Sequence, residues 1–546
     1  MPEPTDVADL AALAATRAPD RLALVEAGGR SLTFAALDEQ VSRFSTGLGG
    51  LGVVGGQRVM LVLGNRIEFV VAHLGALRAH AVSVPVDPRT GVPDLAWMIA
   101  DSGAALVVAD AHSVATVRAA VALVRTVVGG GHVDGLEDVD PAVVARARDP
   151  RILVAGTDPR VEEGETAWAD VVATDPRPVP ASTDPERLAA LLYTVTAAGR
   201  PRAAMLTHRA LLANLTQFSL VQPATMHGDD VVLGLLPLHH VYGLNAVLGS
   251  ALWHRAKVVL VDQFHPETTL DVIDDEAVSV LPVAPPVIRA WLGHPGLRER
   301  LGPVRLVLSG SELLPADVAA EFAAQSGLPV HQGYGLTEGA PVVTTTLGAA
   351  GHSAAGDPAP GSFGAPLPGV EIGIVDDATG RPARDEPGRL RIRGENLFSG
   401  YWPDGTDGPD ADGWWDTGDV GWTDENDELH LVDRARDVIV VSGFNVYPSE
   451  VEEVVATAAG VRDCAVVGAA DPTSGQSVVA YVVLAPNSEE LGVRIAITEV
   501  VREQLARFKQ PSRVEFVDRL PTTGSGRVAR GRLRGMERRR AGGLLG

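Results

Sequence analysis

Apolar runs alternate with helical patterns along the first 185 residues of the chain. Continuous apolar segments at Arg58–Leu63, Ala81–Val86 and Ala104–Ala109 predict buried strands, and Arg66–His80 repeats apolar residues at helical spacing. Continuous apolar strands that alternate with helices are typical of a parallel sheet with both faces covered. We therefore expect an α/β fold in this part of the chain.

A different pattern begins near residue 188. The apolar run Leu188–Leu192 is followed by a stretch rich in small residues, Tyr193–His208, and then by helical spacing over Arg209–Phe218. We interpret these as a strand, a loop and a helix, preceded by surface connections in the Asp-, Pro- and Gly-rich stretch 129–184. Such a loop can bring backbone N–H groups and hydroxyls against a phosphate chain, with a basic residue supplying charge.

Composition limits the domain count and the class of partner. A chain of 546 residues exceeds one ordinary hydrophobic core, so two or more domains are expected. Its net charge of −23 argues against nucleic acid or an anionic membrane as the main partner, although a small anion could still bind in a local basic pocket. We interpret the arginine-rich stretch Arg530–Arg540 as a solvated, frayed end of the chain.

Cysteine usage and the N-terminal sequence bear on the compartment. The single cysteine, Cys464, excludes an internal disulfide or a cysteine metal cluster, and its apolar neighbours indicate a packing role. The N-terminus lacks a basic segment followed by an apolar core, so no secretory signal is expected. No run of about 18 apolar residues occurs, so no membrane-spanning helix is expected. We predict a cytoplasmic protein.

Five segments carry a resemblance to a known family. They are Tyr193–His208 (YTVTAAGRPRAAMLTH), Leu235–Leu244 (LLPLHHVYGL), Tyr334–Glu338 (YGLTE), Asp412–Gly421 (DGWWDTGDVG) and Leu520–Arg530 (LPTTGSGRVAR). In order and spacing they resemble motifs of the adenylate-forming superfamily, which comprises acyl-CoA synthetases, luciferases and the adenylation domains of peptide synthetases. The resemblance extends over about residues 20–535 and is to the acyl-CoA synthetase, or fatty-acid–CoA ligase, branch.

The resemblance implies a two-domain architecture. A large N-terminal domain of mostly parallel sheets covered by helices is expected over residues 1–435. A smaller, mobile C-terminal α+β domain is expected over residues 436–546, with the hinge at Arg436. Within that domain, Cys464–Gly468 and Ser477–Leu484 are predicted strands.

The resemblance also assigns a nucleotide site to YGLTE. Tyr334 is expected to stack on adenine, Gly335 to let the backbone approach the nucleotide, and Thr337 to hydrogen-bond the α-phosphate. Glu338 is expected to hold Mg²⁺ on the triphosphate, because a hard cation prefers oxygen ligands. A glycine turn with an exposed acid is the alternative explanation of this segment.

Further site residues follow from the other motifs. Asp419 is expected to bind both ribose hydroxyls, because a carboxylate can accept two hydrogen bonds at once. The remaining assignments are Ser311 at the adenine, Arg434 at the ribose, Thr194, Thr196, Gly199 and Arg202 at the phosphates, Gly443 at the pantetheine channel, and Arg527 between the acid carboxylate and the α-phosphate.

The acid pocket is the most chain-specific part of the resemblance. His240 matches the histidine that lines this pocket in acyl-activating members, although a His–His pair in an apolar run can also be a satisfied helix start. No acidic residue stands between Leu235 and Lys257, whereas members that activate amino acids place an aspartate there to hold the ammonium group. We expect a plain carboxylic acid, and the family branch implies a fatty acid.

The resemblance thus implies an ATP-dependent acyl-CoA synthetase that uses ATP, Mg²⁺ and CoA. The phosphate loop departs from the family pattern: Val195, Thr196, Ala197 and Ala198 stand where the family has Ser, Gly, Thr and Thr, and Arg202 and Arg527 stand where it has lysine. Arginine does not reproduce a compact ammonium, and one lost oriented donor can cost about 3 kcal/mol. The alternative is an adenylation-impaired member that binds nucleotide or acyl-adenylate in a regulatory or half-reaction role.

Overall fold

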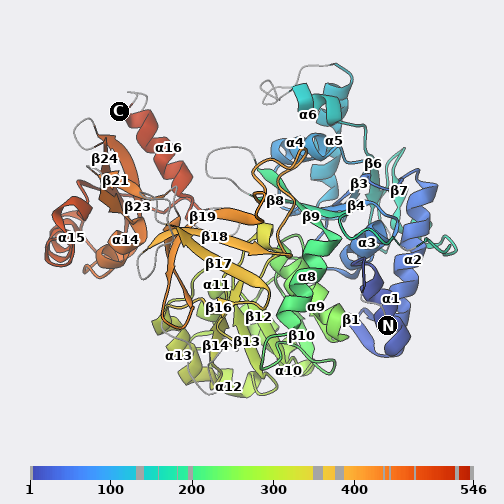
Figure 1. Cartoon of the computed structure of the whole chain (residues 1–546), viewed down its shortest axis with the longest axis horizontal. Helices are drawn as coiled ribbons and strands as arrows, with labels where there is room; N and C mark the ends of the chain where they lie inside the picture. Colours follow the sequence, from blue (N-terminus) through green and yellow to red (C-terminus); the bar gives the residue numbers. More distant parts are fainter. Residues whose placement is uncertain are drawn as a thin grey trace.

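Two seven-stranded sheets form the body of the protein (Figure 1). The computed structural model describes residues 4–130, 141–157, 159–180, 182–194, 201–348, 361–375, 387–434, 437–441, 444–471, 475–522 and 528–541. The first sheet, here called the N-terminal sheet, contains, in spatial order, β7 (Thr166–Ala167), β6 (Arg151–Val154), β5 (Leu106–Ala109), β3 (Arg58–Val62), β4 (Val82–Pro85), β8 (Leu188–Thr194) and β9 (Arg202–Thr207). All neighbours are parallel except β9, which is antiparallel to β8.

The second sheet, here called the central sheet, is built from more distant parts of the chain. Its strands in spatial order are β14 (Val330–Gln332), β13 (Leu306–Ser309), β12 (Val280–Val283), β10 (Val231–Gly234), β11 (Lys257–Leu260), β1 (Leu22–Glu26) and β2 (Ser31–Thr33). All neighbours are parallel except β2, which is antiparallel to β1. This parallel architecture confirms the α/β expectation.

Helices cover both faces of each sheet. Between the sheets lie α1 (Asp9–Arg17), α2 (Phe34–Gly50), α3 (Ile67–Arg78), α7 (Trp168–Val172), α8 (His208–Ser219), the π-helix η1 (Tyr242–Gly249) and α9 (Ser250–His254). The outer face of the N-terminal sheet carries α4 (Val92–Ser102), α5 (Val114–Val128) and α6 (Pro141–Arg146). The outer face of the central sheet carries α10 (Pro266–Asp275), α11 (Pro285–Trp291), α12 (Leu297–Arg300) and α13 (Ala316–Ser326).

Strand β3 shows why the apolar runs are continuous. Val59 and Leu61 pack into the core between the sheets, whereas Met60 and Val62 pack under α4 and α5 on the other face. Successive side chains of a strand point to opposite faces, so a strand covered on both faces needs apolar residues at every position. The predicted strands β3, β4 and β5 and the predicted helix α3 are confirmed.

Two smaller units follow along the chain. An antiparallel sheet contains β17 (Val370–Val375), β18 (Gly388–Gly394), β19 (Trp414–Thr423) and β20 (Leu429–Arg434), next to the short pair β15 (Thr344–Thr345) and β16 (Ala365–Pro366). The C-terminal unit contains β21 (Ile439–Val441), β22 (Phe444–Val446), β23 (Val461–Asp471), β24 (Gly475–Leu484), β25 (Arg513–Phe516), α14 (Pro448–Ala456), α15 (Glu490–Gln504), η3 (Arg507–Lys509) and α16 (Arg530–Ala541).

The C-terminal unit has hydrophobic clusters of its own and is drawn in orange and red in Figure 1. A large α/β domain with a smaller C-terminal α+β domain is the predicted fold class, and it is confirmed. The predicted boundary at residue 435 and the hinge residue Arg436 lie outside the described residues. Cys464 contacts the carbonyl oxygen of Glu452, and burial raises the pKa of its thiol to about 12. Both observations support a packing role.

Three sequence-based expectations were wrong. The stretch 129–184 holds β6, a core strand, in addition to surface connections. Residues 202–207 form β9, so the segment 193–208 that was expected to be a loop holds a strand, whereas the predicted strand before it and the predicted helix after it are confirmed as β8 and α8. The arginine-rich end forms α16, whose Leu533 is 1% exposed and whose Arg530 pairs with Glu452, so it is no frayed tail. None of the described helices combines the length and apolarity needed to cross a bilayer.

Candidate active site

The β8–β9 hairpin carries two of the predicted phosphate residues. Thr194 ends β8 and Arg202 begins β9, and their backbones are paired across the hairpin. The hydroxyl of Thr194 donates to the carbonyl oxygen of Arg202 at 3.3 Å. Thr196 and Gly199, which stand between them in the sequence, lie outside the described residues. The two strand ends therefore place Thr194 and Arg202 together at the base of the predicted phosphate turn.

The matched residues Thr207 and His208 lie at the start of helix α8, one strand beyond the β8–β9 connection. The helix begins at His208, after all of β9, and Thr207 caps it by accepting a hydrogen bond from the amide of Ala210 at 3.2 Å. His208 is fully buried, and its Nδ1 accepts from the amide of Val7 at 3.1 Å. The matched Thr–His pair therefore caps α8 and ties the start of this helix to Val7 of the N-terminal segment.

Tyr334 and Asp419 form a hydrogen-bonded pair between two sheets. Tyr334 follows β14, Asp419 lies on β19, and the tyrosine hydroxyl donates to Oδ2 of Asp419 at 2.7 Å. The two residues are 6% and 9% exposed. Gly335 is needed for packing, because a Cβ there would lie 2.5 Å from the carbonyl oxygen of Pro341. The two motifs YGLTE and TGD are thus joined through side chains 85 residues apart.

Glu338 lies in the short helix η2 (Thr337–Gly339), directly after Thr337, and is 7% exposed. Its Oε1 accepts a hydrogen bond from the hydroxyl of Tyr401 at 2.6 Å. This burial excludes the alternative of an exposed acid after a glycine turn. The carboxylate lies close to the hairpin, because Tyr401 is paired with Ala204 of β9.

The donor set around Glu338 fits Mg²⁺ that arrives with a nucleotide. Within the described ranges, no three His, Cys, Asp or Glu side chains are grouped as a metal cage. Mg²⁺ is usually held by one or two carboxylates together with substrate phosphates, so a dedicated cage is not required. The buried Glu338 carboxylate, close to the β8–β9 hairpin, is one such ligand.

His240 lies after β10, next to the start of η1. Its Nδ1 accepts a hydrogen bond from the amide of Tyr242 at 3.2 Å, and its side chain is exposed. The Tyr242 ring packs against Gly310, where an added Cβ would lie 2.5 Å from the ring. Ser311 follows with a left-handed φ of 76° and an exposed side chain. The structure therefore brings His240 and Ser311 to the same edge of the central sheet through Tyr242 and Gly310.

The neighbouring His239 fits a different role. Its Nε2 lies 3.7 Å from Asp87, and burial lowers the pKa of its imidazole. His239 thus lies against a residue of the segment that follows β4, and only His240 of the pair is exposed. The assignment of His240 as the pocket histidine stays a prediction.

Asn65 is a residue that the sequence pattern missed. It follows β3, is 6% exposed, and its Nδ2 donates to the carbonyl oxygens of Gly234 and Leu236 at 3.0 Å each. Its Oδ1 accepts from the amide of Leu238 at 2.9 Å. One side chain of the N-terminal sheet therefore holds the segment of the central sheet that leads to His240. A Gly-Asn pair after an apolar strand indicates only a turn, so this role of Asn65 could not be predicted from the local pattern.

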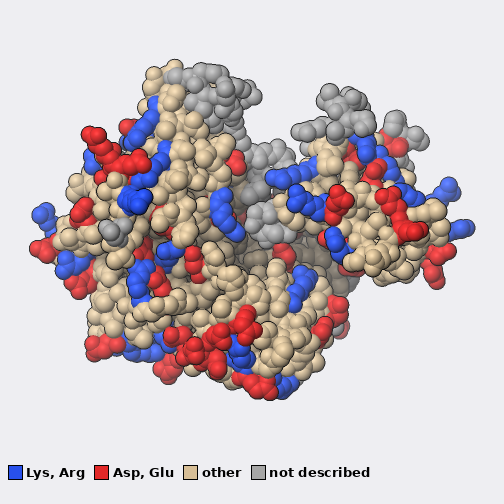
Figure 2. Space-filling model, turned by 180° about the vertical axis from the view of Figure 1, so that it is seen from behind, with Lys and Arg blue, Asp and Glu red and all other residues tan. Residues whose placement is uncertain are grey.

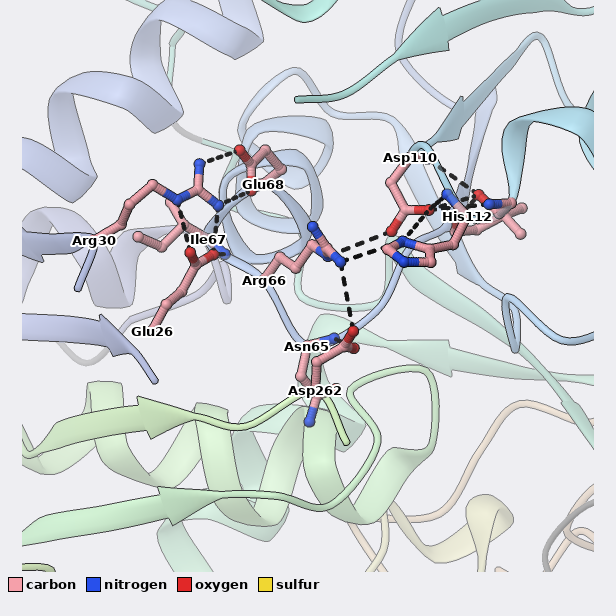
Figure 3. Close-up of polar contacts among 11 residues, drawn as sticks. Glu26, Arg30, Asn65, Arg66, Ile67, Glu68, Asp110, His112 and Asp262 are labelled. Carbon is pink, nitrogen blue, oxygen red and sulfur yellow. Dashed lines mark hydrogen bonds and ion pairs between the residues drawn. The ribbon is translucent and has the colours of Figure 1, made fainter. Parts of the chain in front are cut away.

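Arg66 extends the same junction. Figure 3 shows its guanidinium between Asp262 and Asp110, at 3.5 and 3.4 Å, with Asn65 beside Asp262. On the other side of the same loop, Arg30 binds Glu26 and Glu68. Loops from the carboxyl ends of both sheets thus meet through paired charges.

The remaining predicted residues belong to the C-terminal half. Arg434 ends β20 and is paired by backbone register with Asp419, and its side chain is outside the description. Gly443 and Arg527 lie outside the described residues. On the face drawn in Figure 2, acidic and basic side chains are interspersed. In α16, Arg534 pairs with Asp437, and Arg540 pairs with Glu515, so these arginines are not presented together to a polyanion.

Comparison with known proteins places the whole chain in context. Residues 12–402 match the family model described as AMP-binding enzyme, and residues 450–527 match that of the AMP-binding enzyme C-terminal domain. The 4-coumarate–CoA ligase 5 of Oryza sativa subsp. japonica is 31% identical over 532 residues, which cover 94% of this chain and 91% of the relative. The long-chain-fatty-acid–CoA ligase of Bacillus subtilis (strain 168) is 30% identical over 543 residues, covering 95% and 92%.

Among solved structures, ATP-bound MatB from Rhodopseudomonas palustris matches with a TM-score of 0.82 at 28% identity, over 97% of this chain and 98% of that chain. The match extends over both the N-terminal and the C-terminal units described above. The arrangement of sheets is therefore shared with a protein that binds ATP.

Proposed function

Since the chain belongs to the AMP-binding enzyme family, we propose that it is an ATP-dependent acyl-CoA synthetase. The observation that carries the proposal is the set of side-chain contacts that joins the separate motifs. Tyr334 binds Asp419, and Glu338 is linked through Tyr401 to the β8–β9 hairpin. The curated relatives named above are acid–CoA ligases and match along more than nine-tenths of this chain.

In the first half-reaction, a carboxylate oxygen of the acid attacks the α-phosphorus of ATP. A new O–P bond forms, the bond to the β-phosphate oxygen breaks, and acyl-adenylate and pyrophosphate result. The protein must position two reactants and stabilise charge on phosphate oxygens, with little covalent work of its own. Mg²⁺ bound at Glu338 would neutralise triphosphate charge.

The site residues divide this work. Tyr334 and Asp419 would hold the adenosine, with the Asp419 carboxylate accepting from the Tyr334 hydroxyl and from the two ribose hydroxyls. Gly335 and Ser311 would border the adenine. Thr337 would bond the α-phosphate. The hairpin residues Thr194, Thr196, Gly199 and Arg202 would face the β- and γ-phosphates, and Arg527 would bridge the carboxylate and the α-phosphate.

In the second half-reaction, the CoA thiol attacks the acyl carbon, a thioester forms and AMP leaves. Rotation of the C-terminal domain about Arg436 would exchange Arg527 for the loop at Gly443, which would line the pantetheine channel. Arg434 would stay at the ribose through both steps. CoA and ATP are thus co-substrates of one site.

We assign a fatty acid as the substrate acid. No acidic residue occurs between Leu235 and Lys257, the segment that includes His240 and η1, so an ammonium-bearing acid would be left without a counter-charge. His240 would contact the carboxylate, and the apolar face of η1 would contact the acyl chain. An aromatic acid is the second candidate, because the 31% identical relative from Oryza sativa is named a 4-coumarate–CoA ligase, and the Tyr242 ring lies against Gly310 at the same edge.

Exchange of labelled pyrophosphate into ATP, measured with each acid of a panel, tests the first half-reaction alone. We expect exchange with fatty acids, and exchange only with cinnamic-type acids would instead identify the aromatic candidate. No exchange with any acid would overturn the ligase proposal.

An adenylation-impaired role is the alternative, favoured by the engagement of Arg202 with Asp407 at 2.8 Å. An arginine held by a carboxylate is less available to phosphate than a free ammonium. Supplying synthetic acyl-adenylate and CoA bypasses adenylation. Thioester formation from the adenylate, with no pyrophosphate exchange, would establish this half-reaction role.

A further inference from the structure

The segment 398–407, which follows β18, connects the phosphate hairpin to Glu338. The amide of Phe398 donates to the carbonyl oxygen of Glu338, and the amide of Trp402 donates to that of Ala203, both at 2.9 Å. Tyr401 forms a bridge with Ala204 of β9. The segment is therefore fixed by backbone bonds to both sides of the predicted phosphate site.

Tyr401 uses its side chain to hold the Glu338 carboxylate. The hydroxyl donates to Oε1 at 2.6 Å, and the ring packs edge-on against Phe398. A hydrogen bond to an ionised carboxylate is short and about twice as strong as a neutral one. A phenol with an ordinary pKa of about 10 carries its proton at neutral pH, so the hydroxyl is the donor in this contact.

Arg202 covers the other face of the Tyr401 ring. The centre of its guanidinium lies 3.8 Å from the ring centroid, within the range of a cation–π contact. Its Nη2 lies 2.8 Å from Oδ2 of Asp407, whose backbone is held by the indole of Trp415. A planar guanidinium can stack on a ring and offer an edge to a carboxylate at the same time, whereas an ammonium is a compact point charge.

We propose that Tyr401 is a positioning residue for Glu338, and that Arg202, oriented by Asp407, holds Tyr401 in place. This deepens the proposed function and rests on it, because the oriented carboxylate is the one that would bind Mg²⁺ with ATP. Arg202 thereby influences the triphosphate and its Mg²⁺ in two ways. Its own charge attracts the phosphates, and its contact with Tyr401 keeps the Glu338 carboxylate oriented. Arg202, which stands where the family pattern has lysine, thus has two specific partners in this chain, the Tyr401 ring and the Asp407 carboxylate.

The test measures the Mg²⁺ dependence of nucleotide binding by calorimetry, using α,β-methylene-ATP, whose α–β bridge cannot be cleaved and which therefore cannot transfer its adenylyl group. Tyr401→Phe removes only the hydroxyl. We expect the Mg²⁺ concentration for half-maximal binding to rise about tenfold, the equivalent of one charge-assisted hydrogen bond, while metal-free AMP binding stays unchanged. Tyr481→Phe is the matched control, because Tyr481 donates to Glu537 in the C-terminal unit, and it should leave both measurements unchanged.

Variants at the arginine separate its two roles. Arg202→Lys keeps the positive charge but loses the planar guanidinium that contacts both Tyr401 and Asp407. It should therefore shift the Mg²⁺ dependence in the same direction as Tyr401→Phe. The double variant should shift it no further than Tyr401→Phe alone, because Arg202 acts through the hydroxyl that is already absent. Asp407→Asn should produce a smaller shift in the same direction.

Three results would overturn the proposal. The first is a Mg²⁺ dependence that Tyr401→Phe leaves unchanged. The second is an equal weakening of AMP binding and analogue binding by Tyr401→Phe. The third is tighter binding of the analogue by Arg202→Lys with the Mg²⁺ dependence of the wild type. The readout is binding, so it is independent of turnover. A wild-type protein without pyrophosphate exchange but with the predicted Mg²⁺ shifts would overturn the ligase function and leave this inference intact.

Discussion

Two buried histidines couple folding to pH. Burial lowers the pKa of His208 to about 4 and that of His73 to about 3, and His73 is bonded to the hydroxyl of Ser83 at 2.9 Å. In the unfolded chain a histidine titrates near pH 6.5. Between about pH 4 and 6.5 the unfolded state therefore binds more protons than the folded state, and the folded state loses stability as the pH falls.

The first prediction concerns the slope of the unfolding free energy against pH. Above about pH 6.5 both histidines are neutral in the folded and the unfolded state, so they do not change the free energy of unfolding with pH. Below about pH 6.5 each histidine lowers the free energy of unfolding by up to about 1.4 kcal/mol per pH unit. His73→Gln removes one titrating group and should reduce the slope of the unfolding free energy, measured by urea denaturation from pH 4.5 to 7. His112→Gln, at an exposed histidine, is the control. A wild-type slope in His73→Gln would contradict the prediction.

A second prediction concerns Gly310. Its alanine variant would place a methyl carbon 2.5 Å from Cε1 of Tyr242, so the ring must move at the edge where His240 and Ser311 meet. Overpacking of this kind costs about 1–3 kcal/mol. We expect Gly310→Ala to raise KM for the acid about tenfold or more and to leave KM for ATP nearly unchanged.

Gly49→Ala is the matched control for Gly310, because Gly49 lies in α2 and an added Cβ there contacts nothing within 4 Å. It should leave both KM values unchanged. If Gly310→Ala raises KM for ATP and for the acid equally, Tyr242 borders the nucleotide and not the acid.

Among the elements, the β3–α3 loop joins the two sheets at their carboxyl ends. Asn65→Ala would leave the buried amide of Leu238 without its acceptor, at a cost of about 1–3 kcal/mol, and would release the segment before His240. We expect lower stability together with a KM for the acid raised about tenfold, measured by thermal unfolding and pyrophosphate exchange. Arg30→Ala breaks the ion pairs with Glu26 and Glu68 in the same junction without touching that segment.

Arg30→Ala should therefore lower the stability of the protein and leave the KM for the acid unchanged. Equal effects of the two variants on KM would show that Asn65 contributes only to stability.

The elements also show what local pattern can predict. Strands β3, β4 and β5 were predictable because burial on both faces requires an apolar residue at every position. Strand β9 was missed because Ala203, Ala204 and Thr207 resemble a loop, and its strand form depends on pairing with β8 and with Tyr401. The motifs indicated Glu338 and Asp419, but their partners Tyr401 and Tyr334 are 63 and 85 residues away and become visible only in three dimensions.

Across the whole molecule, α16 ties the end of the chain to the start of the C-terminal unit. Arg534 pairs with Asp437, which is 8% exposed and directly follows the predicted hinge Arg436. Removing one partner of a buried ion pair leaves the other charge uncompensated. Arg534→Ala should slow thioester formation from acyl-adenylate several-fold more than it slows pyrophosphate exchange, because the second step would need the rotated domain.

Arg532→Ala, at an exposed position of the same helix, is the control and should affect neither half-reaction. Equal slowing of both half-reactions by Arg534→Ala would contradict a role in domain rotation.

Strand β1 has a consequence for how the chain is made. Residues Leu24–Glu26 pair in parallel with Val258–Leu260, more than 230 residues later. On the ribosome, at about 5–20 residues per second, more than ten seconds pass before β11, the parallel neighbour of β1, is synthesised. Strands β3, β4 and β5 of the N-terminal sheet can pair during that interval, so the central sheet forms after them. Nascent chains halted before residue 257 should therefore expose β1 to proteases and chaperones while the β3–β5 region is already protected.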